Sequence, residues 1–426
     1  MKGLSMMFRD SKICLLVTLF SLCLLCFSCN DDAIIKMEQS KSFVKFYGGI
    51  RDQEGVDMKQ TPDEGFILLG STTSFGHGGS DIYLVKVDKF GNEIWSNTYG
   101  GPDNDKGKSI QVTDDGSYVI LGDYQNSDNS TDMYFLKVDS DGGIVFEHTF
   151  GNNSLDSNEH GNEVQKTLDG GFILVGSTTN PDRVETGPTD FYLVKTNRDG
   201  IMEWQRTRGF ENSEEEGNSV VQVDNDNYIV IGTTENAREN DQQNGKNIFA
   251  YKINADGDNI GNRFFGGLND DLGSKICKTD VGYAILGTSS SRLGNGQGGE
   301  DIILIQINQD LEAFSIKTIG GVENERGVSF VQSDDDGFII VGSTTSYTNA
   351  SVNPDIYLVK ADLSGNVLPD WEANPRVFGG EGADEGNAVV QTADGFALIA
   401  TATFFEATDN RVLNLIKTNR QGILLR

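Results

Sequence analysis

Asp169–Thr179 reads DGGFILVGSTT, and Asp190–Lys195 reads DFYLVK. Each stretch is a short run of β-branched and aromatic residues bounded by glycine or polar residues, which is typical of a buried β-strand. The Asp-Gly pair that begins the first stretch favours a tight hairpin turn, because glycine adopts a positive φ without steric cost. No window of the chain sustains the 3.6-residue apolar spacing of an amphipathic helix. We therefore predict an all-β protein.

The same pattern recurs seven times between residue 48 and the C-terminus. Each copy is anchored on a glycine, and successive anchors are 51 to 59 residues apart. The anchors are Gly48, Gly100, Gly151, Gly209, Gly266, Gly320 and Gly379. The segments of a copy follow a fixed order of four strand-like stretches, the first of which has the consensus Gly-x-Ser-Val-x-Gln. Four strands at a period of about 55 residues are typical of one blade of a β-propeller, with an open solenoid as the main alternative.

The two ends of the chain favour a closed ring over a solenoid. The seventh copy runs from Gly379 to Arg426 and lacks most of its fourth strand, whereas Phe43–Gly48 matches the fourth-strand segment Trp95–Gly100. An N-terminal strand that completes the last blade would remove an open sheet edge. We therefore predict a seven-bladed β-propeller with four antiparallel strands per blade, formed by residues 41–426 as a single domain and closed by residues 41–47.

Residues 1–28 are predicted to be a lipoprotein signal peptide. Basic residues precede the apolar segment Ile13–Phe27, which is too short for an ordinary membrane span. Cys26–Cys29 reads CFSC and resembles a bacterial lipobox, in which the signal is cleaved before the last cysteine. The resemblance implies that Cys29 carries the lipid, as palmitate and related acyl chains. A plain secretory signal is the alternative.

The residues after Cys29 bear on the location of the protein. Asn30–Asp32 reads NDD and resembles the acidic export signal of surface lipoproteins in some Gram-negative bacteria. The resemblance implies a lipid anchor in the outer membrane, with residues 29–40 as a tether and the protein exposed at the cell surface. A periplasm-facing anchor is the alternative. Cys277 is the only thiol that remains after cleavage and acylation, so no intramolecular disulfide is expected.

The charge balance excludes one class of partner. The chain has 34 basic and 64 acidic residues and a formal net charge of −30. Binding to a phosphate backbone requires clustered lysine and arginine, so we predict no nucleic-acid partner.

The repeats resemble the Gly/Asp-rich seven-bladed β-propeller repeats of bacterial secreted proteins and lipoproteins, over residues 41–426. The segment Asp88–Trp95 is also distantly similar to the tryptophan-docking repeats of quinoprotein propellers. The resemblance implies the fold but no common activity, because propellers support unrelated functions.

The connections between second and third strands vary in length and sequence, so we expect ligands to bind on the face that carries them. One set of candidate ligand-binding residues precedes the first strand of six copies, with Gln53 at this position in the other copy. These residues, which we name the loop carboxylates, are Asp105, Glu159, Glu215, Asp271, Glu325 and Asp384. At the mouth of a central channel they would bind a cation or a polyhydroxylated ligand; alternatively, they cap backbone N–H groups of their own loops. A second set, which would stack on sugar rings or pack between loops, is Tyr124, Tyr347, Phe404 and Phe405.

Two further columns of charged residues are interpreted as structural. An aspartate begins the third strand in five copies and is expected to cap a loop. A lysine ends that strand in six copies and is expected at a solvated edge or in a turn contact. Asp139–Gly142 and Asp256–Asp258 are aspartate-rich turns that weakly suggest calcium, but hairpin turns are favoured because they lack the later glutamate of an EF-hand. No cofactor or metal site is otherwise predicted.

Catalytic motifs are not evident. The three histidines show no metal-binding spacing, and no nucleophile elbow or phosphate loop is present. The sequence favours a non-enzymatic binding or scaffold module on the cell surface, with extracellular polysaccharide or protein as ligand. The alternatives are a glycan-cleaving or glycan-modifying enzyme that uses a carboxylate pair, and a structural adhesion module.

Overall fold

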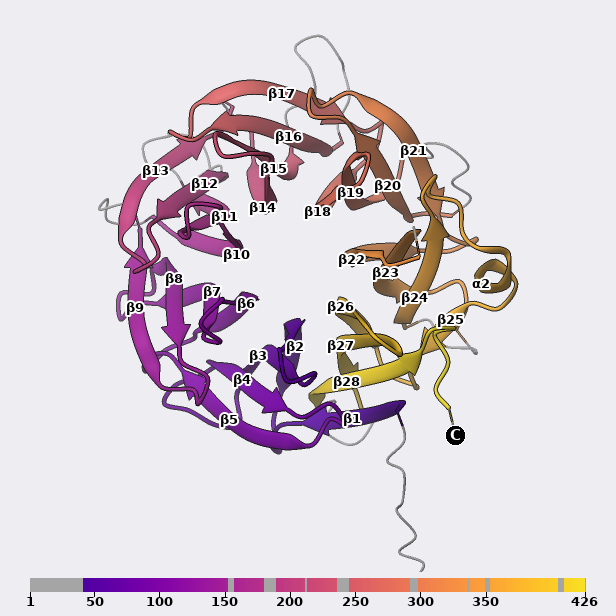
Figure 1. The fold of residues 1–426 in the computed structure, drawn as a ribbon, viewed down its shortest axis with the longest axis horizontal. Helices are drawn as coiled ribbons and strands as arrows, with labels where there is room; N and C mark the ends of the chain where they lie inside the picture. Colours follow the sequence, from indigo (N-terminus) through magenta and orange to yellow (C-terminus); the bar gives the residue numbers. More distant parts are fainter. Residues whose placement is uncertain are drawn as a thin grey trace, which may run out of the picture. The chain divides into compact units, whose positions relative to one another are not determined.

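The structure is a computed structural model that describes residues 41–151, 157–179, 189–210, 213–235, 245–291, 298–335, 337–348, 353–404 and 410–425. Lys41–Arg426 forms one compact unit. Its strands form seven four-stranded antiparallel sheets, which are the seven blades of a β-propeller around a central opening (Figure 1). The predicted fold class is confirmed.

Each blade has one strand at the centre of the ring and one at its rim (Figure 1). From the centre outwards, blades 1 to 3 consist of β2 (Gln53–Gln60), β3 (Phe66–Thr72), β4 (Asp81–Val87) and β5 (Glu93–Tyr99); β6 (Lys106–Val112), β7 (Tyr118–Gln125), β8 (Thr131–Val138) and β9 (Ile144–Phe150); and β10 (Glu159–Lys166), β11 (Phe172–Thr179), β12 (Thr189–Thr196) and β13 (Met202–Arg208). Blades 4 and 5 consist of β14 (Glu215–Gln222), β15 (Asn227–Thr234), β16 (Asn247–Asn254) and β17 (Asn259–Phe265), and of β18 (Asp271–Thr279), β19 (Gly282–Ser289), β20 (Asp301–Ile307) and β21 (Ala313–Ile319). Blades 6 and 7 consist of β22 (Glu325–Ser333), β23 (Gly337–Thr344), β24 (Asp355–Asp362) and β25 (Arg376–Phe378), and of β26 (Glu385–Thr392), β27 (Gly395–Thr403), β28 (Arg411–Asn419) and β1 (Phe43–Tyr47).

One short helix, α2 (Pro369–Ala373), interrupts the connection from β24 to β25. Its Trp371 is buried and lies 6.2 Å from the ring of Phe396 in the next blade. Within the described part of the chain, no helix has the length and apolar character needed to span a bilayer.

The apolar core lies between blades. The two middle strands of a blade are covered on both faces, so their central residues are apolar, and every residue of β3 and β4 is buried. Outer strands such as β9 alternate between exposed and partly buried side chains. Seven clusters of buried apolar residues result, each shared by two neighbouring blades.

A glycine near the start of each inner strand allows neighbouring blades to approach closely. A Cβ added to any of these ring glycines would lie 2.7 to 3.0 Å from a backbone carbonyl oxygen in the second strand of the preceding blade. The ring glycines are Gly55, Gly107, Gly161, Gly217, Gly273, Gly327 and Gly386. In five blades the amide of the ring glycine also donates to a side chain of that neighbouring strand, as Gly107 N does to Ser71 Oγ at 3.2 Å.

Four of the six lysines that end the third strands are buried, so a turn contact and not a solvated edge is the right interpretation for Lys86, Lys195, Lys360 and Lys417. Lys86 Nζ lies 2.8 Å from Asp63 Oδ2, and Lys195 Nζ lies 2.9 Å from Asp169 Oδ2, each in the turn between first and second strands. Burial opposes ionisation of Asp63, but the hydrogen bond from Lys86 lowers its pKa to about 2. These pairs attach the turn to the third strand.

The outer strand of blade 7 comes from the opposite end of the chain. β1 pairs antiparallel with β28, from Phe43 opposite Lys417 to Tyr47 opposite Leu413. Tyr47 is 6% exposed, and its hydroxyl donates to Gly91 O at 2.7 Å in blade 1. β1 therefore contacts both β28 of its own blade 7 and the neighbouring blade 1.

We predict that a soluble chain starting at Gly48 loses cooperative unfolding, whereas one starting at Lys41 retains it. Burial of Phe43 and Tyr47 is worth roughly 3–6 kcal/mol at about 1.5–3 kcal/mol per large apolar side chain, which is comparable with a total stability of about 5–15 kcal/mol. Thermal unfolding followed by circular dichroism measures the difference. Equal melting of the two chains would contradict a closing role for β1.

Candidate functional site

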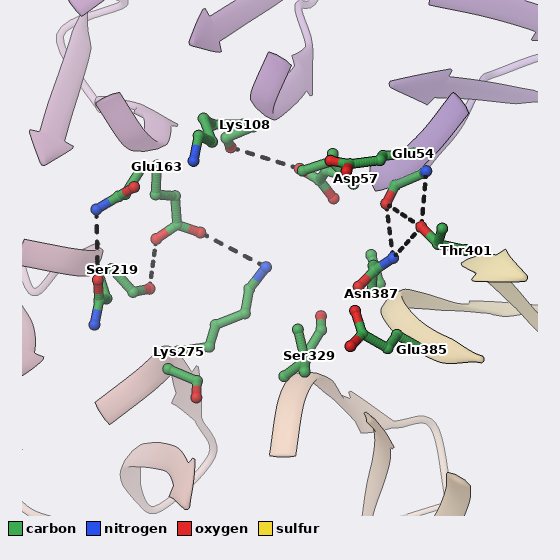
Figure 2. Close-up of a pocket in the computed structure, with 18 of the residues that line it drawn as sticks. Glu54, Asp57, Lys108, Glu163, Ser219, Lys275, Ser329, Glu385, Asn387 and Thr401 are labelled. Carbon is green, nitrogen blue, oxygen red and sulfur yellow. Dashed lines mark hydrogen bonds and ion pairs between the residues drawn. The ribbon is translucent and has the colours of Figure 1, made fainter. Parts of the chain in front are cut away.

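A cavity of about 300 Å³, which we name the upper cavity, occupies part of the central channel (Figure 2). Its walls come from the inner strands of all seven blades, with Thr401 of β27 and Arg411 of β28 beside them. It lies towards the start of the inner strands. These starts adjoin the connections between blades and between second and third strands, as the hydrogen bond from Asp105 N to Ser80 O at 2.7 Å illustrates. The upper cavity is thus on the side of the variable loops.

A β-bulge in every inner strand decides which side chains line this cavity. The register with the second strand shifts directly after each ring glycine, as between Gly161 and Glu163 in β10. A bulge places an extra residue opposite one partner residue and redirects the side chains next to it. The two residues that follow the ring glycine therefore both line the channel, as Asn162 and Glu163 do.

The bulged residues connect successive blades. Asn162 Nδ2 donates to Gly217 O at 2.9 Å, and Asn218 Nδ2 donates to Gly273 O at 2.7 Å. Asn387 Nδ2 makes the same contact from blade 7 to blade 1, where it reaches a ring-glycine carbonyl at 2.6 Å. Because the amide nitrogens are used in this way, the side-chain oxygens of these residues remain as polar groups in the channel wall.

The wall of the upper cavity also contains charged side chains, which form an ion pair between blades. Glu163 is buried, lies 3.7 Å from Lys275 Nζ, accepts the hydroxyl of Ser219, and accepts Val220 N at 2.9 Å. Figure 2 shows Lys275 reaching across the cavity towards Glu163. The carboxylate of this blade-3 residue is therefore held by blades 4 and 5.

Asp57 forms the other buried anionic centre of the wall. Lys59 Nζ lies 2.7 Å from Asp57 Oδ1, and Ile110 N donates to Oδ2 at 3.0 Å. Burial opposes ionisation, but the positive charges of Lys59 and Lys275 outweigh it and lower the pKa of Asp57. Burial likewise opposes protonation of Lys275, and Glu163 with Asp57 raises the pKa of this lysine. Both carboxylates are thus engaged by cations.

Other polar groups of the upper cavity are available. Glu385 is exposed, and neither it nor Ser329 has a hydrogen-bond or ion-pair partner among the described residues. Arg411 forms an ion pair with Glu54 at the same wall.

A second cavity of about 360 Å³ lies towards the opposite end of the inner strands and shares Asp57, Lys275 and Ser329 with the upper cavity. Cys277 lines it, and burial raises the pKa of this thiol to about 12. The thiol is therefore protonated at neutral pH and a poor nucleophile.

The loop carboxylates are buried: five have no exposed surface and Asp384 is 3% exposed. Five of them accept hydrogen bonds from backbone amides of their own loops, for example Asp271 from Gly267 N at 2.7 Å and Glu325 from Gly321 N at 2.5 Å; these five are Asp105, Glu215, Asp271, Glu325 and Asp384. Burial raises the pKa values of Asp105, Glu215 and Asp384. The structure thus places these residues in a capping role inside the loops and not on the channel surface, and ligand binding by them stays a prediction.

The candidate aromatic residues divide into two groups. Tyr124 and Tyr347 pack on Tyr134 and Tyr357 of their own blades, with ring centroids 5.3 and 5.4 Å apart. Phe404 is 47% exposed, and Phe405 lies outside the described residues.

The aspartate-rich turns are hairpins. Gly142 and Gly257 have φ values of 85° and 80°. Asp139 Oδ1 accepts Asp141 N at 3.0 Å and Gly143 N at 2.8 Å, so this carboxylate serves its own turn. Among the residues that the structure describes, no group of three or more His, Cys, Asp or Glu side chains is placed to hold a metal ion.

Asp57, Glu163 and Lys275 were not singled out by sequence reasoning. They occupy the position of the serine in the Gly-x-Ser-Val-x-Gln motif, where Ser109, Ser219 and Ser329 stand in other copies. Charged residues that replace a repeated serine were the available signal.

Comparisons with known proteins give the fold only. No protein-family model matches the chain, and no curated protein matches it. A protein of unknown function from Bacteroides caccae is 12% identical, with 75% of this chain and 93% of that chain covered and a TM-score of 0.43. The periplasmic gluconolactonase of Pseudomonas aeruginosa is 9% identical, with 73% and 83% covered and a TM-score of 0.46. An α-L-arabinofuranosidase from Fusarium graminearum is 10% identical, with 88% and 98% covered and a TM-score of 0.41.

We predict that Lys275→Met lowers the free energy of unfolding at pH 7 by about 3 kcal/mol, because removing one partner leaves a buried charge uncompensated. The double variant Lys275→Met/Glu163→Gln should recover most of this loss. Asp57, whose folded pKa is lowered, contributes stability above its unfolded pKa of about 3.9 that is lost as the pH falls further. The deficit of Lys275→Met should accordingly shrink below about pH 4. Urea unfolding between pH 7 and pH 3 measures both effects, and additive single-variant losses would contradict the network.

Proposed function

We propose that this protein is a cell-surface lipoprotein whose propeller is a non-enzymatic binding module for extracellular polysaccharide. The ligand would contact the upper cavity and the loops around it. The lipid anchor would be carried by Cys29, which lies outside the described residues.

The observation that carries the proposal is the chemistry of the upper cavity. Its wall offers amide, hydroxyl and carboxylate groups from seven blades within about 300 Å³, and Ser329 and Glu385 are unengaged there among the described residues. Polar groups that converge in a concave site are suited to hydrogen-bonding the hydroxyls of a sugar. A saccharide unit entering from the variable-loop side would meet donors and acceptors in several directions.

The same chemistry favours binding over glycan cleavage. A glycosidase requires one carboxylic acid whose pKa is raised and a second carboxylate close to it. In the wall of the upper cavity, Asp57 has a lowered pKa, and Glu163 lies against Lys275. The lowered pKa keeps Asp57 ionised at neutral pH, and Glu163 is held by Lys275 and Ser219. A structural adhesion role without a small ligand remains the third candidate.

We expect Glu385→Gln/Ser329→Ala to weaken saccharide binding at least tenfold, because the variant removes a charged acceptor and a hydroxyl from the wall. Screening the detergent-solubilised protein on a glycan array identifies the saccharide, and calorimetry with that saccharide measures the affinity. Glu64→Gln, an exposed change in a first-to-second turn, is the matched control and should bind like the wild type. Release of reducing ends during incubation would favour the enzymatic alternative.

The anchor has its own test. We expect Cys29→Ala to remove incorporation of labelled palmitate and to release the protein from the outer-membrane fraction. Protease accessibility of the wild type in intact cells would support surface exposure, whereas protection until the outer membrane is permeabilised would support the periplasm-facing alternative.

A further inference from the structure

The third strands of six blades have a large apolar residue at one position. The third strand of blade 7 has a polar residue there. The apolar residue stands opposite the second strand's glycine and is tyrosine in four blades, phenylalanine in β16 and isoleucine in β20. In β28 the residue is Asn414, opposite Ala400. The position holds Tyr83, Tyr134, Tyr192, Phe249, Ile303, Tyr357 and Asn414.

In other blades this side chain fills the junction with the preceding blade. Tyr83, Tyr134 and Tyr357 each belong to the apolar cluster shared with the preceding blade. The junction of blades 6 and 7 has its own apolar cluster, with Asn414 at the position that tyrosine holds in four other blades. An asparagine side chain is several atoms shorter than a tyrosine, so it fills less of this junction.

A cavity of about 600 Å³ is present at this place, and we name it the blade-7 cavity. Its apolar lining includes Val44, Phe46, Ile356, Phe378, Phe404 and Ile416. Phe46 and Phe404, which are 50% and 47% exposed, contact each other edge to face at 5.3 Å. The cavity is separate from the central channel, because it shares no lining residue with the upper cavity among the described residues.

Asn414, which lines this cavity, carries an unsatisfied polar atom. The residue is 3% exposed and lines the cavity, and its Oδ1 has no hydrogen-bond partner among the described residues. Asp384 also lines the cavity, but its oxygens accept Gly380 N at 2.8 Å and Thr403 N at 3.0 Å. A buried acceptor without a partner is unfavourable, and a donor that reaches it gains a hydrogen bond.

We propose that the blade-7 cavity is a binding site for small aromatic molecules that carry a hydroxyl or N–H donor, such as phenols and indoles. The ring lies among the apolar side chains, and the donor bonds to Asn414 Oδ1. This site is independent of saccharide binding in the channel.

The probe is p-cresol, which is the side chain that tyrosine would place at this position, and p-xylene is its isostere without a donor. Calorimetry with the detergent-solubilised full-length protein should show saturable binding of p-cresol with an affinity at least tenfold above that of p-xylene. Asn414→Leu should remove this preference, because it removes the acceptor. Asn414→Tyr should abolish p-cresol binding and raise the melting temperature, because the new ring occupies the cavity. Glu385→Gln/Ser329→Ala, which alters the channel, should leave p-cresol binding unchanged.

Several outcomes would overturn the proposal. Undetectable p-cresol binding, equal affinity for p-cresol and p-xylene, or undiminished binding to Asn414→Tyr would each do so. Binding that appears only in Phe405→Ala would show that this side chain of the protein itself occupies the cavity, and would likewise overturn an open ligand site.

Discussion

The structure depends on the close approach of each inner strand to the carbonyl oxygens of the preceding blade. At the seven ring glycines a Cβ would lie within 3.0 Å of such an oxygen, so any larger residue would force two blades apart. Because the sheets form a ring, a displacement at one junction must be absorbed at the others. A bulge follows this glycine in every inner strand, and the bulge turns two successive side chains towards the channel. The same short segment therefore sets both the approach of the blades and the chemistry of the channel.

The repeat pattern was sufficient to predict the seven blades and their four strands. The middle strands are covered on both faces, so each appears in the sequence as a short apolar run, and turn residues mark where each run ends. It was harder to predict which side chains of the inner strand face the channel, because the bulge shifts the alternation of side chains by one residue. The serine position of the inner-strand motif thus faces the channel, and Asp57, Glu163 and Lys275 form its charged wall. Alternation alone does not indicate that these three residues come from strands that lie on different sides of one cavity.

Burial of the acidic residues also exceeded what the sequence indicated. Asp105 and Glu215 stand where polar loops meet the inner strands, and exposure is the ordinary expectation for such charged residues. Their loops fold over them because the carboxylates accept backbone amides that would otherwise be buried without partners. Lysines such as Lys86 are buried for a related reason, since each finds an aspartate in an adjacent turn. Repetition of a charged residue in this protein marks structural roles, and departures from the repeat, such as Asn414, mark places where a cavity forms.

The pairing of β1 with β28 has a consequence for how such a ring changes over evolution. The first strand of the chain belongs to the last blade, so the ends of the chain meet inside blade 7. Duplication or loss of one whole copy in the interior of the gene would leave every sheet with four strands and the terminal pairing intact. The number of blades is then set by how many contacts between neighbouring blades fit around the axis, and not by the pairing of β1 with β28. Ring size and ring closure are thereby separate properties of the sequence.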